Sequence, residues 1–162
     1  MWSPAGIGND VPVIAPRNID ELCAYVGHEV GASEWQAVTQ DDVNRFAEAT
    51  GDDQWIHTDV ARARQSELGG TIAHGFYTLS LAPKLLGELM SFEHFRYAMN
   101  YGLNRVRFIS PLPVGDQVRM RARVDAVEHR TGGTGVTTTL TFERAGSDRP
   151  VCVAELLIHL GA

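Results

Sequence analysis

The sequence predicts an α+β fold, in which one antiparallel sheet packs against the helices that precede it. Three observations support this. A helical pattern runs up to Gly51, the segment from Thr71 to Met90 is the most apolar of the chain, and alternating strand patterns follow from Tyr97 onward. A run of strands after a buried helix is typical of this class, because the sheet buries its apolar face against that helix. With 162 residues, the chain is long enough for one domain with its own core.

Residues 1–17 are expected to form an extended arm, and residues 18–162 a single folded domain. The arm holds three prolines and two glycines, a composition that disfavours a helix. After it, Asn18 is a suitable N-cap for a short helix that Gly27 closes. The alternating residues 33–38 then predict a short strand that leads to the next helix.

The helix that ends at Gly51 is amphipathic and has clear boundary signals. Thr39 with Asp42 three residues later forms a capping-box pattern, and Gly51 can adopt the left-handed conformation that ends helices. Its apolar face has the spacing three, one, three, in Val43, Phe46, Ala47 and Thr50. The loop after Gly51 is therefore held by a rigid element, which is where reactive side chains are often found.

The segment Thr71 to Met90 predicts a buried helix with a kink. Its apolar residues leave almost no polar face: Phe76, Leu79, Leu81, Ala82, Leu85, Leu86 and Leu89. A helix that is apolar nearly all round is packed in a core. Lys84 and Glu88 interrupt it too often for a membrane span, and Pro83 removes one backbone hydrogen bond, which bends a helix.

The remaining chain predicts a meander of four strands. They cover residues 97–109, 117–128, 134–144 and 151–160, with turns at Gly115-Asp116 and Gly132-Gly133. In the second strand Val118, Met120, Ala122, Val124 and Ala126 alternate with polar residues, so one face of the sheet meets solvent. The arginines on its polar side, and Arg62 and Arg64 on a short helix capped by Asp59, are interpreted as solvated; contact with phosphates is the alternative.

Composition excludes several classes of function. A net charge of -6 and a pI near 5.4 do not fit a nucleic-acid binder. Cys23 and Cys152 are far apart and are interpreted as reduced, buried thiols, while no Cys cluster or His-x-x-x-His pattern suggests a metal. We expect no metal and no cofactor. Without an 18-residue apolar run or a signal-like N-terminus, no membrane association is expected, and a cytoplasmic location is favoured.

Asp52 and His57 are the candidate reactive groups. An acid and an imidazole a few ångströms apart can bind one water between them, and either can take its proton or return it. Such a pair suits hydration, dehydration or hydrolysis. The five-residue separation alone does not establish this, since loop aspartates more often form turns or helix caps.

Three segments together are similar to the MaoC-like dehydratase family, which includes the (R)-specific enoyl-CoA hydratases, and above all to its nodulation-protein-N-like branch. They are Phe46 to His57, Ile72 to Phe76, and Arg107 to Asp116, in family order. The resemblance extends from about Val30 to the C-terminus. It implies a hot-dog fold, with the sheet wrapped around a long central helix, and a homodimer with its acyl tunnel close to the subunit interface.

The resemblance also implies roles for residues. Asp52 and His57 match the water-activating pair of the family motif Gly-Asp-x-Asn-Pro-x-His, although Gln54-Trp55 stand where the common members carry Asn-Pro. Gly75 N–H, at the start of the buried helix, is expected to hold the thioester oxygen as it becomes an enolate. Further residues expected at the substrate are Trp55, His74, Phe76 and Ser80, with two alternatives: His74 caps the helix or orients the loop, and Ser80 bonds the preceding turn.

The expected function is (R)-specific hydration of a trans-2-enoyl thioester, carried on CoA or on acyl carrier protein, to the (3R)-hydroxyacyl thioester. Which of Asp52 and His57 is the base stays open, because the pair can titrate as a unit. Two alternatives remain. A hot-dog thioesterase would hydrolyse the thioester, and a non-catalytic acyl-binding or partner subunit would bind it unchanged.

Overall fold

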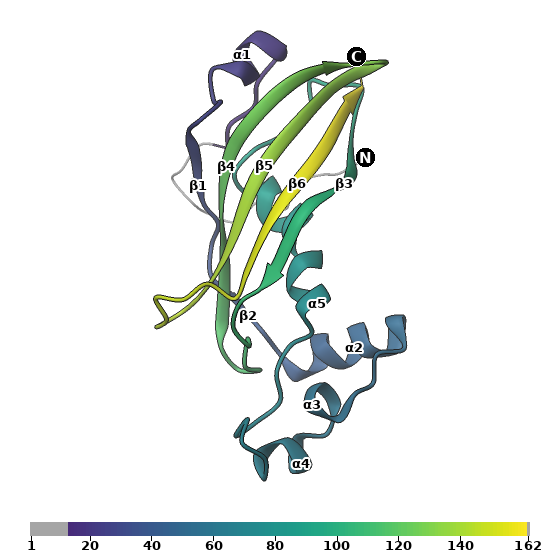
Figure 1. The fold of residues 1–162 in the computed structure, drawn as a ribbon, viewed down its shortest axis with the longest axis vertical. Coiled ribbons are helices and arrows are strands. Elements are labelled where there is room, and N and C mark those ends of the chain that lie inside the picture. The colour runs from purple at the N-terminus through teal and green to yellow at the C-terminus, as the bar shows by residue number, and fades with distance from the viewer. Residues whose placement is uncertain (1–12, 162) are drawn as a thin grey trace.

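The computed structural model describes residues 13–161, so most of the expected N-terminal arm lies outside the described residues. The described chain forms a six-stranded antiparallel sheet in the order β1-β4-β5-β6-β3, with β2 also paired to β4 (Figure 1). The strands are β1 (Glu29–Ala32), β2 (Gln36–Ala37), β3 (Tyr97–Phe108), β4 (Gln117–Arg130), β5 (Gly133–Arg144) and β6 (Cys152–Gly161). The four long strands of the predicted meander are thus confirmed, and β3 lies at one edge.

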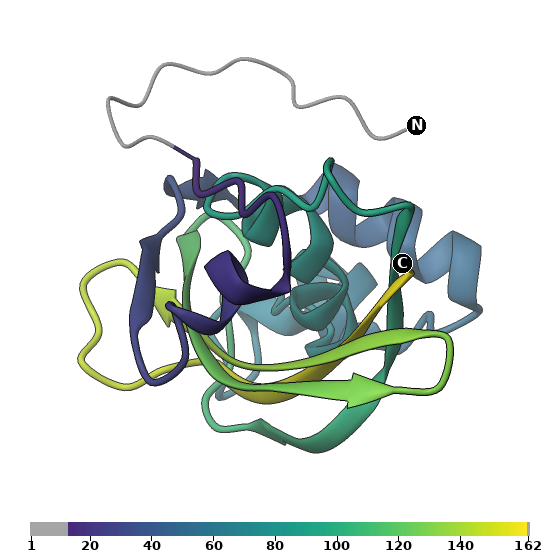
Figure 2. The same cartoon turned by 90° about the horizontal axis from the view of Figure 1, so that it is seen from above.

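The predicted central helix is present but shorter and in two parts. It consists of α5 (Gly75–Ser80) and α6 (Ala82–Gly87). It begins at Gly75, the predicted start, so the first residues of the apolar segment from Thr71 lie outside the helix. Pro83 lies in the first turn of α6 and has no N–H to donate, and the Leu81 N–H bonds to Thr78 O three residues back. The sheet curves around these helices, which gives the expected hot-dog arrangement (Figure 2).

The predicted caps of the other helices are confirmed. These helices are α1 (Ile19–Cys23), α2 (Gln40–Thr50), α3 (Trp55–Thr58) and α4 (Val60–Arg64). The N-cap side chains of Asn18, Thr39 and Asp59 accept hydrogen bonds from the backbone N–H three residues later. In Figure 1, α2, α3 and α4 gather at the end of the sheet where α5 begins, so this end is built from short elements and loops.

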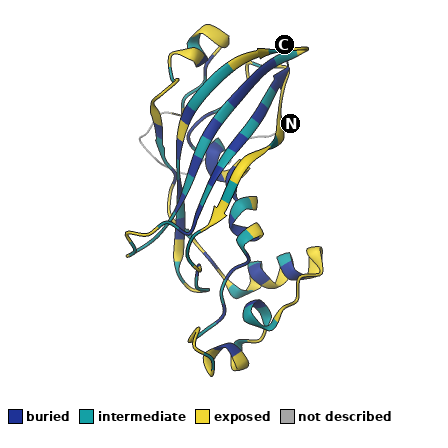
Figure 3. Ribbon diagram, viewed as in Figure 1, coloured by how far each residue is buried: buried dark blue, intermediate teal, exposed yellow. Residues whose placement is uncertain are grey.

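The core lies between the central helix and the concave face of the sheet. Val43, Leu85, Met120, Leu140 and Phe142 are fully buried there. Along β4 and β6 buried residues alternate with less buried ones, as Figure 3 shows, because successive side chains of a strand point to opposite faces. The edge strand β3 is mostly exposed.

The polar side of β4 is a face of ion pairs. Arg119, Arg121 and Arg123 pair with Glu143, Glu29 and Asp125. These partners support the solvent-face interpretation of that arginine row over a phosphate-binding one. The predicted alternation stops at a bulge between Val124 and Ala126, after which Val127 packs against the core and Ala126 does not belong to it.

Three details differ from the sequence predictions. Residues 33–38 form only the two-residue β2, and β1 just before it was not predicted. Cys23 is exposed, whereas Cys152 is buried as predicted, because α1 is short and turns only Leu22 into the core. Thr50, placed on the buried face of α2, is exposed at its last turn. Among the described residues, none of the helices is long and apolar enough to cross a membrane.

Candidate functional site

The loop between α2 and α3 presents Asp52 and His57 at the end of the sheet. Gly51 ends α2 with a φ of 77°, a left-handed conformation that glycine adopts without strain. The chain turns there and enters α3 four residues later at Trp55. Asp52 stays on the exposed loop, and His57, one turn further, is only 7% exposed.

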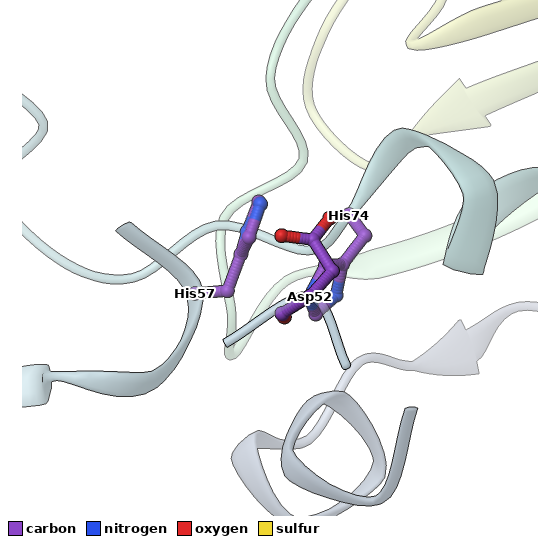
Figure 4. Close-up of side chains that lie close together, drawn as sticks. All are labelled: Asp52, His57 and His74. Carbon is purple, nitrogen blue, oxygen red and sulfur yellow. The ribbon is translucent and has the colours of Figure 1, made fainter. Parts of the chain in front are cut away.

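The structure brings the two groups together. A carboxylate oxygen of Asp52 and a ring nitrogen of His57 lie within 4.8 Å of each other, and in Figure 4 the carboxylate points toward the ring. Two hydrogen bonds of about 2.8 Å that meet at a water with a tetrahedral angle separate their outer atoms by about 4.6 Å. The upper limit of 4.8 Å includes this one-water separation.

A hydrogen bond between His57 Nδ1 and the backbone determines the tautomer of the ring. Nδ1 lies 2.7 Å from the carbonyl oxygen of Ile72, which only accepts, so Nδ1 carries the proton. In the neutral ring Nε2 then has a free lone pair. Burial lowers the pKa of His57, with a smaller contribution from His74 in the same direction, against the Ile72 carbonyl and Asp52, which raise it. His57 is thus a neutral base at pH 7.

His74 contacts both the Asp52 backbone and the His57 ring. It is 2% exposed, and its Nε2 donates to the backbone oxygen of Asp52 at 2.9 Å. Its ring stacks on that of His57, with centroids 3.8 Å apart and planes at 30°. It is also the N-cap residue of α5, although its side chain makes no cap hydrogen bond. The structure therefore places His74 in the loop-orienting position and not in the cleft described below.

The cluster of Asp52, His57 and His74 has ligand-type atoms but a poor arrangement for a metal. Each histidine already uses one nitrogen, toward Ile72 O and Asp52 O. The remaining nitrogens, His57 Nε2 and the buried, unpartnered His74 Nδ1, belong to stacked rings. Lone pairs lie in the ring plane, so those of stacked rings do not converge on a tetrahedral centre. The geometry suits proton transfer through water better.

An apolar cleft of about 300 Å³ reaches His57 and Gly75. It is lined by His57, Ile72, Ala73, Gly75, Thr78, Phe108, Ile109, Ser110, Pro111, Leu112 and Val151. Gly75 begins α5, so its N–H has no acceptor within the helix. A Cβ on Gly75 would lie 2.8 Å from the ring of Phe108, so glycine permits the close approach of these two cleft walls.

A larger depression, of about 460 Å³, lies beside α2. Asp52, His57, His74 and Gly75 are not among its lining residues. Its lining residues are Asn44, Ala47, Glu48, Gly51, Asp53 and Thr58. Because most of them are exposed and none is a base or an oxyanion donor at a helix start, the smaller cleft is the candidate active site.

The other predicted substrate residues, Trp55, Phe76 and Ser80, are not among the residues that line the cleft. Trp55 is covered by the guanidinium of Arg62, 4.4 Å from the ring centroid. Phe76 is 67% exposed and meets Phe108 edge to face at 5.6 Å. The Ser80 hydroxyl donates to Tyr77 O at 2.7 Å, which is the alternative predicted for it.

Sequence reasoning missed two cleft residues that the fold supplies. Phe108 was interpreted as part of a strand and of a family motif, and Ile72 as part of a motif, and neither was predicted to line the site. No local signal marks a backbone carbonyl such as that of Ile72 as the partner of a histidine fifteen residues earlier. Phe108, by contrast, ends β3 just before a proline-rich turn, and a large apolar residue at such a boundary was a usable signal.

Comparison with known proteins agrees with this geometry. A family model described as MaoC like domain matches residues 22–145. The chain belongs to this MaoC-like family. The 3-hydroxyacyl-thioester dehydratase Z of Mycobacterium tuberculosis (strain ATCC 25618 / H37Rv) is 46% identical over 144 residues, which are 88% of this chain and 95% of that protein.

Two further relatives place the chain within the family. Nodulation protein N of Rhizobium leguminosarum bv. viciae is 41% identical over 140 residues, 85% of this chain and 87% of that protein. The (R)-hydratase of A. caviae superposes with a TM-score of 0.69 over 83% of this chain and 96% of that one, at 24% identity, which shows the shared fold. This MaoC-like chain is a hydro-lyase.

Proposed function

We propose that the protein catalyses the reversible syn hydration of a trans-2-enoyl-CoA to the (3R)-hydroxyacyl-CoA. The observation that carries the proposal is the approach of the Asp52 carboxylate to within 4.8 Å of a ring nitrogen of His57, on a ring that lines an apolar cleft and has its Nδ1 bonded to Ile72 O. The similarity to a 3-hydroxyacyl-thioester dehydratase supports the same reaction in the dehydration direction.

The Nδ1–H tautomer of His57 supports a role for His57 as the base and for Asp52 as its partner. Water bound between Asp52 and His57 gives a proton to Nε2 as its oxygen bonds to C3 of the enoyl group. The electron pair of the C2–C3 double bond moves toward the thioester, and its oxygen becomes an enolate. His57 returns the proton to C2 from the same face, which makes the addition syn. Asp52 holds the second hydrogen of the water and stabilises the transient imidazolium.

Gly75 is proposed to stabilise the enolate. Its N–H begins α5 and opens on the same cleft as His57, so a thioester oxygen held there is within reach of a preorganised donor. Contacts of Trp55, His74, Phe76 and Ser80 with the substrate stay predictions. The carrier, CoA or acyl carrier protein, is distinguished by assaying both.

We also propose a homodimer formed through the edge strand β3. This strand exposes large apolar side chains: Tyr97, Met99, Tyr101, Leu103 and Phe108. An open edge with such a surface is a template for pairing with another chain. Light scattering after size exclusion should give twice the monomer mass, and a Tyr101→Asp variant should shift it toward the monomer; a wild-type monomer would remove this proposal.

The activity is tested by the loss of the conjugated absorbance of crotonyl-CoA and longer enoyl-CoAs, with the configuration of the product determined. Asp52→Asn and His57→Ala should each lower kcat by about 10²–10⁴-fold, the contribution of a positioned proton transfer. His129→Ala is the matched control, since His129 is an exposed residue of β4.

The same assay separates the alternatives. Release of free thiol from a saturated acyl-CoA, with no hydration, identifies a thioesterase. Binding of enoyl-CoA with unchanged absorbance identifies a non-catalytic acyl-binding subunit. Wild-type activity in Asp52→Asn or His57→Ala would refute the proposed mechanism.

A further inference from the structure

Gln40 contacts the backbone of His57 from outside the motif. It is the first residue of α2, and its Nε2 donates to the backbone oxygen of His57 at 2.7 Å and to Asn44 Oδ1 at 2.9 Å. Its Oε1 accepts from the Thr71 hydroxyl at 2.6 Å. An amide that donates twice and accepts once is nearly saturated, so its orientation is fixed.

The carbonyl that Gln40 binds belongs to a weak helix. α3 has only four residues, Trp55–Thr58, and one isolated turn has little stability of its own. A carbonyl at the end of a helix has no intrahelical partner. The amide of Gln40 supplies that partner, so it fixes the backbone from which the His57 ring extends.

The other contact of Gln40 reaches the segment that holds the His57 ring. Thr71 directly precedes Ile72, whose carbonyl oxygen accepts from His57 Nδ1. The Ile72 N–H in turn donates to Ile56 O at 3.0 Å. The Gln40 side chain thus connects α3 with the segment 71–72. The spacing between these two segments determines the direction of the His57 ring and its tautomer.

We propose that Gln40 is a positioning residue for His57, an inference that rests on the proposed hydratase function. Gln40 does not touch the substrate or the reacting atoms. It holds α3 and the segment 71–72 at the spacing that keeps Nδ1 on Ile72 O and turns Nε2 toward the water site.

Three variants and one control test the proposal. Gln40→Leu removes every hydrogen bond at similar volume, and Gln40→Glu keeps only an acceptor for Thr71. Thr71→Val removes the hydroxyl and leaves the amide on His57 O. Gln65→Leu is the control, because Gln65 is exposed at the end of α4 and makes no side-chain hydrogen bond within the described part of the chain.

Steady-state kinetics with enoyl-CoA should show a split between kcat and KM. We expect Gln40→Leu and Gln40→Glu to lower kcat by about 10–10²-fold, the effect of displacing a catalytic group by a fraction of an ångström to 1 Å, with KM within about two-fold. Thr71→Val should stay within about three-fold and Gln65→Leu at the wild-type value. Each variant is compared at a temperature where its unfolding curve shows it fully folded.

A readout without substrate separates this inference from the function it rests on. Imidazole ¹⁵N spectra should show the Nδ1–H tautomer of His57 in the wild type and a tautomer mixture in Gln40→Leu, with the signals identified by their loss in His57→Ala. A folded Gln40→Leu with wild-type kcat, or with an unchanged tautomer, overturns the positioning role. If the wild type hydrates no enoyl-CoA but Gln40→Leu still shows the tautomer mixture, only the proposed function is overturned.

Discussion

Gly75→Ala tests whether the narrow junction between α5 and β3 matters for catalysis. In the structure a Cβ at this position would lie 2.8–2.9 Å from three ring atoms of Phe108. Carbon atoms prefer about 3.5–4.0 Å, so the ring has to withdraw by about 0.7–1 Å. Phe108 is 47% exposed and can move outward, but in doing so it changes the wall of the cleft.

The effects on stability and on rate are expected to differ. Overpacking costs about 1–3 kcal/mol, while alanine in place of glycine in a helix gains up to about 1 kcal/mol, so the net loss of unfolding free energy is about 0–3 kcal/mol. Displacement of a substrate contact by about 1 Å lowers kcat/KM by about 10²-fold, or about 2.7 kcal/mol of transition-state binding. Activity should therefore fall more than stability.

The assay pairs urea unfolding with enoyl-CoA hydration. Gly70→Ala is the matched control, because a Cβ there meets nothing within 4 Å. In Gly75→Ala/Phe108→Leu the smaller side chain relieves the clash, so stability should recover while the altered cleft wall keeps the rate low. A Gly75→Ala variant with wild-type kcat/KM would show that the position of the Phe108 ring does not matter for the rate.

Three further predictions concern titration. Because burial lowers the pKa of His57 from its ordinary value of 6.5, the acid limb of kcat/KM should lie below pH 6.5, and rates measured between pH 5 and 8 check this. Between the folded and unfolded pKa of His57, the unfolded state binds one more proton than the folded state. The contribution of His57 to the unfolding free energy is therefore fully present above pH 6.5 and is lost as the pH falls toward the folded pKa. His57→Ala should flatten this part of a plot of urea midpoint against pH. Burial raises the thiol pKa of Cys152 to about 11, so a thiol reagent at pH 8 should modify only exposed Cys23 until the protein unfolds, and rapid modification of both would contradict the packing.

Much of the fold was readable because its signals are local and periodic. The strict alternation from Val118 onward defined β4, and the caps at Thr39 and Gly51 defined α2 to the residue. The start of the central helix at Gly75 was predicted, but the path of the segment before it was not. Residues 71–74 are apolar enough to continue a helix, yet they run as an extended segment because Ile72 and Ala73 bond to Ile56 O and Leu112 O, partners that only the folded chain provides.

The residues of the site likewise fall into those that local sequence signals mark and those that only tertiary packing brings together. Asp52 and His57 were found because helix termination at Gly51 and a family pattern both mark them, and the structure brings them within one-water distance. The burial of His74 and its bond to the Asp52 backbone depend on the packing of α5 against the loop, which residue types alone do not encode. The same is true of Gln40, whose three bonds connect positions 4, 17 and 31 residues away.

The proposed choice of His57 as the base rests on a backbone acceptor, the carbonyl oxygen of Ile72. His57 is buried, and a carbonyl oxygen can only accept, so the ring must place its proton on Nδ1 and leave Nε2 open. If the 70–73 segment shifted and the Ile72 carbonyl turned away, both tautomers would be accessible and half or more of the molecules would present an N–H to the water. The extended backbone before α5 is thus as necessary to the proposed proton transfer as the imidazole itself.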